Sequence, residues 1–335
     1  MSATPVLPNF ADVLDAAARI APHLPSTTPL LRVEALDALA DAELLFKAEH
    51  LQRGGAFKFR GACNAVWALD AHSAARGVLT HSSGNHGAAL ALAAASRGIP
   101  CHVVVPDGAN PAKLEAILAH GAQVQRCAAT QQAREQTCAR LQAHTGAELV
   151  HPYADARVIA GQGTVALELL CQAGRSAALD AVVVPVGGGG LCAGVALVLA
   201  TLAPHVQVYA AEPAGADDAL RSLQRGERVV DVVPDTLCDG LRATIGEPNL
   251  QLLQRHGVQV LPVEDAATVQ AMALLWRHGR QLVEPSSATV LAAVLADPAR
   301  FAGRRVGLVL SGGNVDPALF PSLFTPTDTV PVARF

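Results

Sequence analysis

Short apolar runs recur along the chain and are separated by longer, alanine-rich stretches in which polar residues interrupt the hydrophobic pattern. Runs that are continuously apolar rather than alternating are typical of strands covered on both faces. The strands expected on this basis are residues 44–48, 77–81, 102–106, 124–127, 181–186, 206–211, 258–263 and 305–310.

The stretches between these runs have the composition and length of helices. The expected helices are residues 63–70, 85–97, 112–120, 131–143, 159–172, 192–202, 268–280 and 287–296. Regular alternation of strand and helix predicts an α/β protein with parallel twisted sheets covered by helices.

A chain of 335 residues can bury a sizeable core and is long enough for two domains. The run of strand–helix units in residues 77–153 predicts a small domain, which we expect to be mobile. Residues 1–76 and 154–335 would then form the large domain. A ligand is expected in the cleft where parallel strands end.

Composition excludes several classes of protein. The chain is 51% hydrophobic and 16% charged, which excludes disorder, and its net charge of −4 includes no basic block that would indicate nucleic acid or an anionic membrane. No apolar run is long enough to span a bilayer. The seven cysteines are dispersed without a Cys-x-x-Cys pair and the start lacks a signal-peptide pattern, which predicts reduced thiols and a cytoplasmic protein.

The few lysines of the chain include the first candidate for a catalytic residue. The chain has only three lysines among 25 basic residues, and one of them, Lys58, lies in the segment GGAFKFRG between two phenylalanines. Burial lowers an ammonium pKa and yields a nucleophilic amine, as a Schiff base requires. The alternative is a lysine whose stem lies along apolar surface with its ammonium in water.

Four glycines at Gly187, Gly188, Gly189 and Gly190 separate an expected strand from an expected helix. Backbone N–H groups at such a turn can wrap around an anion beside the positive end of the helix, which predicts phosphate binding. The spacing also fits the glycine fingerprint of nicotinamide-dependent oxidoreductases, with Glu212 placed to read a ribose. Such an oxidoreductase would have no use for Lys58.

The segment SSGNHG, from Ser82 to Gly87, begins another helix. Hydroxyls and free N–H groups at a helix N-terminus form a good carboxylate receptor, and Ser83 is also suited to proton transfer. An ordinary helix cap is equally compatible with this segment.

Two further polar segments follow strands. Ser311 ends the last strand, where a neutral hydroxyl can hydrogen-bond a heterocyclic nitrogen, although a simple polar turn fits as well. Glu212, Asp217 and Asp218 offer oxygen ligands to a divalent cation, although spacing alone favours a solvated acidic loop.

Taken in order, the segments GGAFKFRGACNAV, HSSGNHG, VIAGQGT, VPVGGGGL, AAEPAGADD, VEPSSA and VLSGGN resemble the fold-type-II pyridoxal-phosphate enzymes. The similarity is greatest to the branch that contains serine racemases and threonine (serine) dehydratases. It runs from about residue 25 to residue 318. On this basis we expect the protein to lack the C-terminal regulatory domain of biosynthetic threonine dehydratases.

The resemblance implies roles for individual residues around pyridoxal phosphate. Lys58 would carry the cofactor and later act as the base at Cα, and Phe57 would lie near the cofactor ring. Asn85 would bond the ring oxygen and Ser311 the ring nitrogen. The phosphate would lie in the loop formed by Gly187, Gly188, Gly189 and Gly190.

The same resemblance implies a substrate loop and a metal site. The substrate carboxylate would be held by Ser82, Ser83, Asn85 and His86. A divalent cation, Mg²⁺, Mn²⁺ or Ca²⁺, would be bound by Glu212, the carbonyl group of Ala216 and Asp218. A homodimer is expected by resemblance alone.

The activity so implied is dehydration of a β-hydroxy amino acid, such as L-serine or L-threonine, to a 2-oxo acid and ammonia. A serine at the pyridine nitrogen makes the cofactor a weaker electron sink, which favours expulsion of a β-leaving group. The first alternative is an amino-acid racemase. Ser83 favours it, because most threonine dehydratases resemble Ser-Ala-Gly-Asn-His here, whereas serine racemases and hydroxyaspartate dehydratases have a second serine. Tyr153 argues against it, because serine racemases tend to have asparagine at that position.

The second alternative is a dehydratase of threo-3-hydroxyaspartate or another bulky 3-hydroxy amino acid. Ala243 and Ala88 replace polar residues of the racemases, which would leave room for a larger side chain, and Arg134 or Arg242 could bind a second carboxylate. An arginine of this kind is more often an ordinary surface residue, and that interpretation is favoured for both. A binding protein that kept the fold but lost the chemistry is disfavoured by the presence of Lys58, the glycine loop and Ser311.

Overall fold

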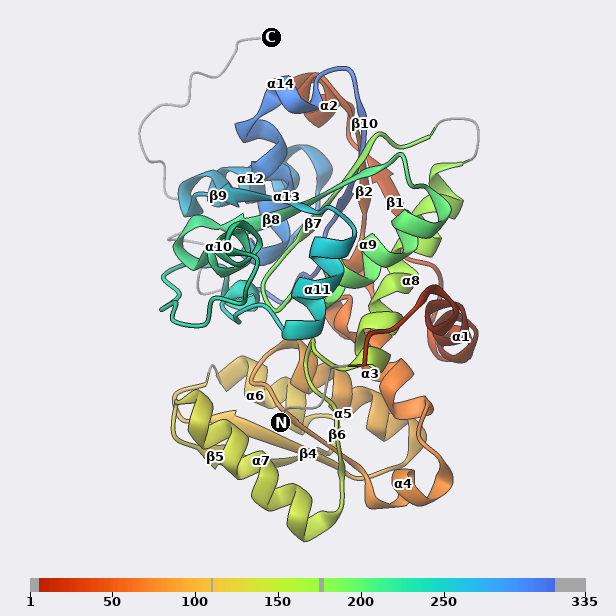
Figure 1. The fold of residues 1–335 in the computed structure, drawn as a ribbon, viewed down its shortest axis with the longest axis vertical. Helices are drawn as coiled ribbons and strands as arrows, with labels where there is room; N and C mark the ends of the chain where they lie inside the picture. Colours follow the sequence, from red (N-terminus) through yellow and green to blue (C-terminus); the bar gives the residue numbers. More distant parts are fainter. Residues whose placement is uncertain (1–5, 110, 175–177, 317–335) are drawn as a thin grey trace.

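In the computed structural model, which describes residues 6–109, 111–174 and 178–316, two separate sheets form the framework. The larger sheet has six strands in the order β1-β2-β10-β7-β8-β9 and fills the upper part of Figure 1. All neighbouring strands are parallel except the edge pair β1 and β2. Its strands are β1 (Leu30–Arg32), β2 (Glu43–Lys47), β7 (Ala181–Pro185), β8 (Gln207–Pro213), β9 (Gln259–Val263) and β10 (Arg305–Val309).

The smaller sheet has four parallel strands in the order β5-β4-β3-β6 and lies in the lower part of Figure 1. Its strands are β3 (Val78–His81), β4 (Cys101–Pro106), β5 (Gln123–Cys127) and β6 (Glu148–Leu149). All of them fall between residues 77 and 153. The boundaries of the expected domains and the mobility of the smaller one remain predictions.

Helices cover both faces of the larger sheet. One apolar core lies between the sheet and α1, α8, α9 and α11, and a second lies between its other face and α2, α12 and α13. The helices are α1 (Phe10–Ile20), α2 (Glu34–Ala40), α3 (Lys58–Trp67), α4 (Ala71–Arg76), α5 (Asn85–Arg97), α6 (Pro111–Leu118), α7 (Gln131–Thr145), α8 (Ala156–Ala173), α9 (Gly190–Leu202), α10 (Asp218–Arg225), α11 (Glu247–Arg255), α12 (Asp265–Gly279), α13 (Pro285–Ala296) and α14 (Pro298–Phe301).

Helix α3 joins the two parts of the molecule. Its residues Phe59, Ala62 and Val66 lie in the core of the smaller sheet together with α5, and the same helix packs closely on α8. A Cβ atom on Gly61 would lie only 2.4 Å from Nε2 of Gln162, so this close approach of α3 to α8 requires glycine. A change in the position of α3 would therefore alter the packing of both the smaller sheet and α8.

The α/β class with parallel sheets is confirmed, and each expected strand is present to within two residues. The expectation that a helix begins at residue 63 was wrong, because α3 begins at Lys58 itself. Sequence patterning also missed the helices α1, α2, α4, α10, α11 and α14 and the short strands β1 and β6. Helix α1 begins with a capping box formed by Asn9 and Asp12. Strands of two or three residues are too short to leave a pattern of their own.

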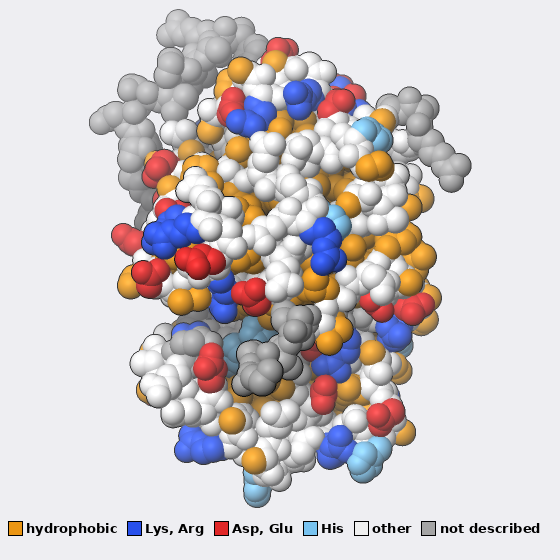
Figure 2. Space-filling model, viewed as in Figure 1, with side chains coloured by type: hydrophobic (Ala, Val, Ile, Leu, Met, Phe, Trp, Pro, Cys, Tyr) orange, Lys and Arg blue, Asp and Glu red, His pale blue; other side chains and the backbone are white. Residues whose placement is uncertain are grey.

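Positive and negative side chains are interspersed on the face shown in Figure 2 and form no single-sign patch there. Within the residues that the structure describes, no helix is long and apolar enough to cross a membrane. All seven cysteines are free, and six of them are buried. The absence of nucleic-acid partners remains a prediction.

Candidate active site

Lys58 is the first residue of α3, and its amine lies inside the protein. The Nζ atom donates a hydrogen bond to the carbonyl oxygen of Pro152 over 3.1 Å and lies 5.0 Å from the centre of the Phe57 ring. Burial lowers the pKa of Lys58 from 10.5 to about 8, and the negative charge of Glu284 partly opposes this shift. Lys58 is therefore a candidate for a nucleophilic amine near neutral pH.

The glycine loop follows β7 and leads into α9. Gly188 lies against the ring of Tyr153, so that a Cβ atom at position 188 would stand 2.3 Å from the ring. Gly189 has a φ of 88°, a left-handed conformation that favours glycine. Side chains are thus excluded from this loop, which is what a close backbone cradle for a phosphate requires.

Ser311 lies at the end of β10, directly beside the segment that carries Lys58. Its carbonyl oxygen accepts a hydrogen bond from Phe57 N over 2.9 Å, and an isolated bridge joins Ala56 to Gly312. Only 2% of Ser311 is exposed. A hydroxyl in this buried position is suited to hydrogen-bond an aromatic ring nitrogen without changing its charge.

The segment from Ser82 to Asn85 connects β3 to α5. Ser82 Oγ accepts a hydrogen bond from Gly84 N, and Asn85 is the first residue of α5. The Nδ2 atom of Asn85 donates to both carboxylate oxygens of Glu284, over 3.1 and 3.0 Å, while its Oδ1 accepts from Asn314. The positive end of α5 thus opens on the same space as Glu284.

His86 lies deeper than the resemblance suggested. Its ring is 2% exposed, its Nε2 atom pairs with the carbonyl oxygen of Val150 at 3.4 Å, and its Nδ1 atom has no hydrogen-bond partner among the described residues. Burial and the nearby charge of Lys58 keep the pKa of His86 well below 6.5, so the ring is neutral. His86 can contribute its backbone N–H to an anion, but not a positive charge.

Arg134, on α7, lies near the loop from the side of the smaller sheet. Its charge lowers the pKa of His81, the residue directly before Ser82, although burial is the larger cause. Its Nε atom is buried and has no hydrogen-bond partner within the described part of the chain. The guanidinium of Arg242, by contrast, is already hydrogen-bonded, since its Nε and Nη2 atoms both donate to the carbonyl oxygen of Thr236.

Two site residues were missed by sequence reasoning. Glu284 precedes α13, is 3% exposed, and faces Asn85; burial raises its pKa despite Asn85 and the nearby Lys113 and Lys58. Lys113, on α6, forms an ion pair with Asp239 of the short helix η5 (Asp239–Leu241). The quoted segment VEPSSA contains Glu284, and the scarcity of lysine was a signal that could have found Lys113.

The expected metal ligands lie behind the glycine loop. Glu212 is fully buried and accepts hydrogen bonds from the N–H groups of Ala219 and Leu220, while Asp218 accepts one from Ile245 N over 2.6 Å. Burial is the main cause that raises the pKa of Glu212 to about 8 and that of Asp218 to about 6. The charge of Asp217 raises both pKa values further, and that of Asp218 also raises the pKa of Glu212. Ala216, which lies between Glu212 and Asp218 in the sequence, is also buried. No group of three or more His, Cys, Asp or Glu side chains that could hold a metal ion occurs in the described ranges.

Close contacts join four of the expected segments into one site. Lys58 bonds Pro152, whose neighbour Tyr153 covers Gly188 of the glycine loop. On the other side, Phe57 bonds Ser311, and a Cβ atom on Gly312 would lie 2.5 Å from Glu284, the partner of Asn85. The segments that carry Lys58, the four glycines, Ser311 and the N-terminus of α5 therefore lie next to one another.

Comparisons with known proteins agree with this geometry. The family model described as "Pyridoxal-phosphate dependent enzyme" matches residues 23–312. A beta-hydroxyaspartate dehydratase from Paracoccus denitrificans is 47% identical over 310 residues, which cover 92% of this chain and 97% of that protein. A serine racemase from Arabidopsis thaliana is 45% identical over 314 residues, which cover 91% of this chain and 94% of that protein.

Solved structures show the same relationship. Maize serine racemase superposes with a TM-score of 0.90 at 40% identity, and the match covers 95% of this chain and 98% of the maize chain. The T.th. threonine deaminase superposes with a TM-score of 0.87 at 42% identity, and the match covers 95% of this chain and 100% of the deaminase chain. The chain belongs to the pyridoxal-phosphate-dependent enzymes, and within them to the fold-type-II group.

Proposed function

We propose that the protein is an ammonia-lyase that removes water from a β-hydroxy amino acid and releases a 2-oxo acid and ammonia. The observation that carries this proposal is the contact chain from Lys58 through Pro152 and Tyr153 to Gly188. It sets a reactive amine beside an anion cradle, as a Schiff-base cofactor with a phosphate tail requires. The residues present therefore fit pyridoxal phosphate.

When bound, pyridoxal phosphate supplies an electron sink that acidifies the Cα–H bond of an amino acid. In the proposed roles, Lys58 holds the cofactor and then takes the Cα proton on its amine. Gly187, Gly188, Gly189 and Gly190 bind the phosphate through their backbone, Phe57 lies beside the ring, and Asn85 and Ser311 bond its oxygen and nitrogen. The buried Ser311 hydroxyl keeps that nitrogen unprotonated, which favours loss of a β-hydroxyl.

Ser82, Ser83, Asn85 and the backbone of His86 are proposed to bind the substrate carboxylate at the N-terminus of α5. Water leaves when the Cα proton and the β-hydroxyl depart from adjacent carbons. The enamine released takes up a proton and is hydrolysed, so that the water lost is regained and the net products are the 2-oxo acid and ammonia.

Two observations favour alternatives within the same site. The described residues supply no hydrogen-bond partner for Nε of Arg134, so its guanidinium offers a cation for a second carboxylate. One relative at 47% identity is a beta-hydroxyaspartate dehydratase. A 3-hydroxyaspartate is therefore the second candidate substrate. Ser83, whose hydroxyl could donate a proton on the face opposite Lys58, supports amino-acid racemisation as the third.

We further propose that Glu212, the Ala216 carbonyl group and Asp218 bind a divalent cation, Mg²⁺, Mn²⁺ or Ca²⁺. The raised pKa values of the two carboxyl groups support this, because a cation between them would favour their ionised forms. Adding each cation to protein treated with EDTA should raise its melting temperature, and Glu212→Gln should abolish the effect. An unchanged melting temperature would contradict the metal site.

The remaining expectations are proposals of the same kind. The free thiols support a reducing compartment such as the cytoplasm. A homodimer, and closure of residues 77–153 over the substrate, are expected from the family resemblance. Scattering profiles that are the same with and without a substrate analogue would count against closure, and sedimentation as a monomer would count against the dimer.

The test of the proposed function is chemical trapping followed by assay. Borohydride treatment of the yellow, cofactor-loaded protein should leave a pyridoxyl group on Lys58, identified by peptide mass spectrometry. Colourless protein that fails to bind added pyridoxal phosphate would overturn the proposal. An adduct on Lys47 or Lys113 instead would overturn the assignment of the site.

A further inference from the structure

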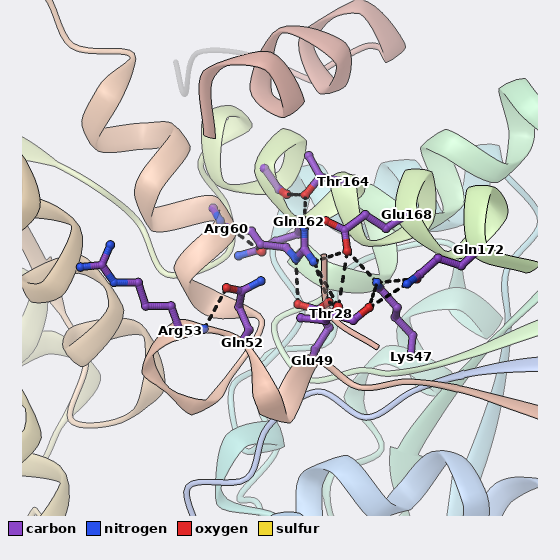
Figure 3. A network of polar contacts seen from close by, with 12 residues as sticks. Thr28, Lys47, Glu49, Gln52, Arg53, Arg60, Gln162, Thr164, Glu168 and Gln172 are labelled. Atoms are coloured by element: carbon purple, nitrogen blue, oxygen red, sulfur yellow. Dashed lines mark hydrogen bonds and ion pairs between the residues drawn. The ribbon is translucent and has the colours of Figure 1, made fainter. Parts of the chain in front are cut away.

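A buried network of charged groups lies beneath the start of α3 (Figure 3). It contains two cations, Lys47 and Arg60, and two carboxylates, Glu49 and Glu168, so its formal charges balance. The side chains of Lys47, Glu49 and Arg60 are 0% exposed. Such charges are retained in a protein interior only when they are fully paired.

Arg60 is the centre of this network. Its Nε and Nη2 atoms donate to the two oxygens of Glu49 over 2.7 and 2.8 Å. Its Nη1 and Nη2 atoms donate to the two oxygens of Glu168 over 2.8 and 2.7 Å, and Nη1 also reaches Thr164 Oγ1 at 3.2 Å. The guanidinium is therefore held by two forked carboxylate contacts, which fix its plane and position.

These contacts come from elements on different sides of α3. Glu49 belongs to the short helix η2 (Glu49–Leu51), which follows β2, while Thr164 and Glu168 lie on α8. Arg60 thus ties the first turn of α3 both to the sheet and to α8. Figure 3 shows its side chain extending between Glu49 and Glu168.

That first turn also carries Lys58. Backbone hydrogen bonds from Phe57 N to Ser311 O and from Gly313 N to Gly55 O hold the segment before it, and Arg60 adds a side-chain restraint. Within the described residues, the N-cap Phe57 makes no side-chain cap hydrogen bond. The preceding residues Gly54 and Gly55 both have positive φ angles, which are accessible mainly to glycine, and they contribute no side chain that could fix the loop. Arg60 N bonds the carbonyl oxygen of Phe57 over 3.0 Å, so the guanidinium and the peptide before Lys58 belong to one turn.

We propose that Arg60 is a positioning residue for Lys58, and that its forked contacts with Glu49 and Glu168 hold the α3 N-terminus where the lysine amine meets the cofactor. This role rests on the function proposed above for Lys58. The guanidinium contacts carboxylates and hydroxyls of the network rather than the glycine loop or the substrate loop, so it acts through the backbone. A shift of about 1 Å in a reacting group is enough to lower a rate on the order of 100-fold.

Lys47 offers a matched control inside the same network. Its Nζ atom donates to Thr28 O, Glu168 Oε2 and Gln172 Oε1 over 2.8, 2.6 and 2.8 Å, so it is as buried and as fully bonded as Arg60. However, it lies on β2, which β1 and β10 hold by ladder hydrogen bonds on both sides. Loss of the Lys47 side chain should therefore destabilise the fold without moving a residue of the site.

The experiment compares Arg60→Met, Arg60→Lys and Lys47→Met in the full-length holoenzyme. Arg60→Lys keeps the charge and serves if the methionine variant does not fold. We would measure the melting temperature, the rate at which pyridoxal phosphate forms a borohydride-reducible link to Lys58 in the apoprotein, and kcat and KM with L-serine. Activities are compared at a temperature where circular dichroism shows every variant folded.

Both methionine variants should lose roughly 10 °C of melting temperature, because each leaves the network with two carboxylates and only one cation. Both Arg60 variants should also lose about 10- to 100-fold in linkage rate and in kcat, with KM within about twofold of wild type. Lys47→Met should keep both rates within about twofold.

Arg60 variants with wild-type linkage rate and kcat would overturn the positioning role. The positioning role would also be overturned if Lys47→Met lost as much linkage rate and kcat as Arg60→Met, because the network would then act through stability alone. A wild-type protein that forms no link at Lys58 would overturn the proposed function first, which separates the two failures.

Discussion

The amine of Lys58 and the carbonyl oxygen of Pro152 are joined by a 3.1 Å hydrogen bond. The next residue along, Tyr153, lies against Gly188. Two consecutive residues, Pro152 through its carbonyl oxygen and Tyr153 through its ring, therefore connect the amine to the glycine loop. This spacing is set by the turn after β6, a segment to which no recognisable catalytic motif points.

Replacement of Lys58 tests the chemistry directly. Lys58→Arg keeps the positive charge but cannot form a Schiff base, and the guanidinium is a very weak base at Cα. We expect kcat to fall by at least about 1,000-fold and borohydride to leave no pyridoxyl group at position 58. Retention of more than a few per cent of the activity would contradict the role of this lysine.

The pKa of Lys58 predicts how stability depends on pH. It is lowered from 10.5 to about 8 in the folded chain, so between these values the unfolded chain binds more protons than the folded one. The free energy of unfolding therefore rises with pH across this window. Lys58→Met removes the titration, and the apo variant should gain up to about 3 kcal/mol over apo wild type near pH 7.

This gain should shrink as the pH approaches 10.5, where the wild-type lysine is neutral in the folded chain and loses its proton in the unfolded one as well. Urea unfolding of the two apoproteins over this range measures the difference, and other titrating groups cancel because they are common to both. A difference that does not depend on pH would show that the amine is not buried as described.

The close contact of Gly188 with Tyr153 predicts the effect of one added methyl group. A Cβ atom at position 188 would lie 2.3 Å from the ring, so Gly188→Ala must displace either the loop or the tyrosine. We expect the Kd for pyridoxal phosphate to rise about 5- to 150-fold, since such overpacking costs about 1–3 kcal/mol. Fluorescence titration of the apoprotein measures this affinity.

The double variant Gly188→Ala with Tyr153→Ala provides the control for that experiment. Removing the ring makes room for the methyl group, so the double variant should bind the cofactor more tightly than Gly188→Ala alone. An affinity no better than that of the single variant would place the cause elsewhere than in the contact with Tyr153.

Arg134 predicts selectivity between substrates. If its guanidinium binds a second carboxylate, Arg134→Met should lower kcat/KM for threo-3-hydroxyaspartate about 10- to 150-fold, the value of a charge-assisted hydrogen bond. The value for L-serine should change less than about threefold. Arg140→Met, on the same helix, is the control, because Arg140 bonds Thr137 rather than the loop. Equal losses on both substrates would exclude this role.

Short motifs were sufficient to nominate candidate site residues because each combines a chemical group with a backbone requirement. Lys58, the four glycines and Ser311 stand in local patterns of the sequence, and contacts in the folded chain bring their segments together, while their roles stay predictions. The sequence alone could not show that His86 is buried and neutral, since its environment is formed by Val150 and other residues distant in the chain.

Partners that meet only in the folded chain were missed for the same reason. Glu284 is separated from Asn85 by 199 residues, and Arg60 from Glu168 by 108, so no local pattern connects them. Likewise α3 was expected to begin too late, because the glycine at position 61 reads as a helix breaker until α8 is seen packed against it.

The central claim is that Lys58 serves a β-eliminating enzyme, and one incubation tests it. Cofactor-loaded protein with a divalent cation would be given L-serine, L-threonine or threo-3-hydroxyaspartate, and 2-oxo acid, ammonia and the epimerised amino acid would be measured in each sample. We predict equal amounts of oxo acid and ammonia, far in excess of the epimer. An epimer comparable to or above the oxo acid would make Ser83 a working proton donor and the protein a racemase, and would contradict the claim.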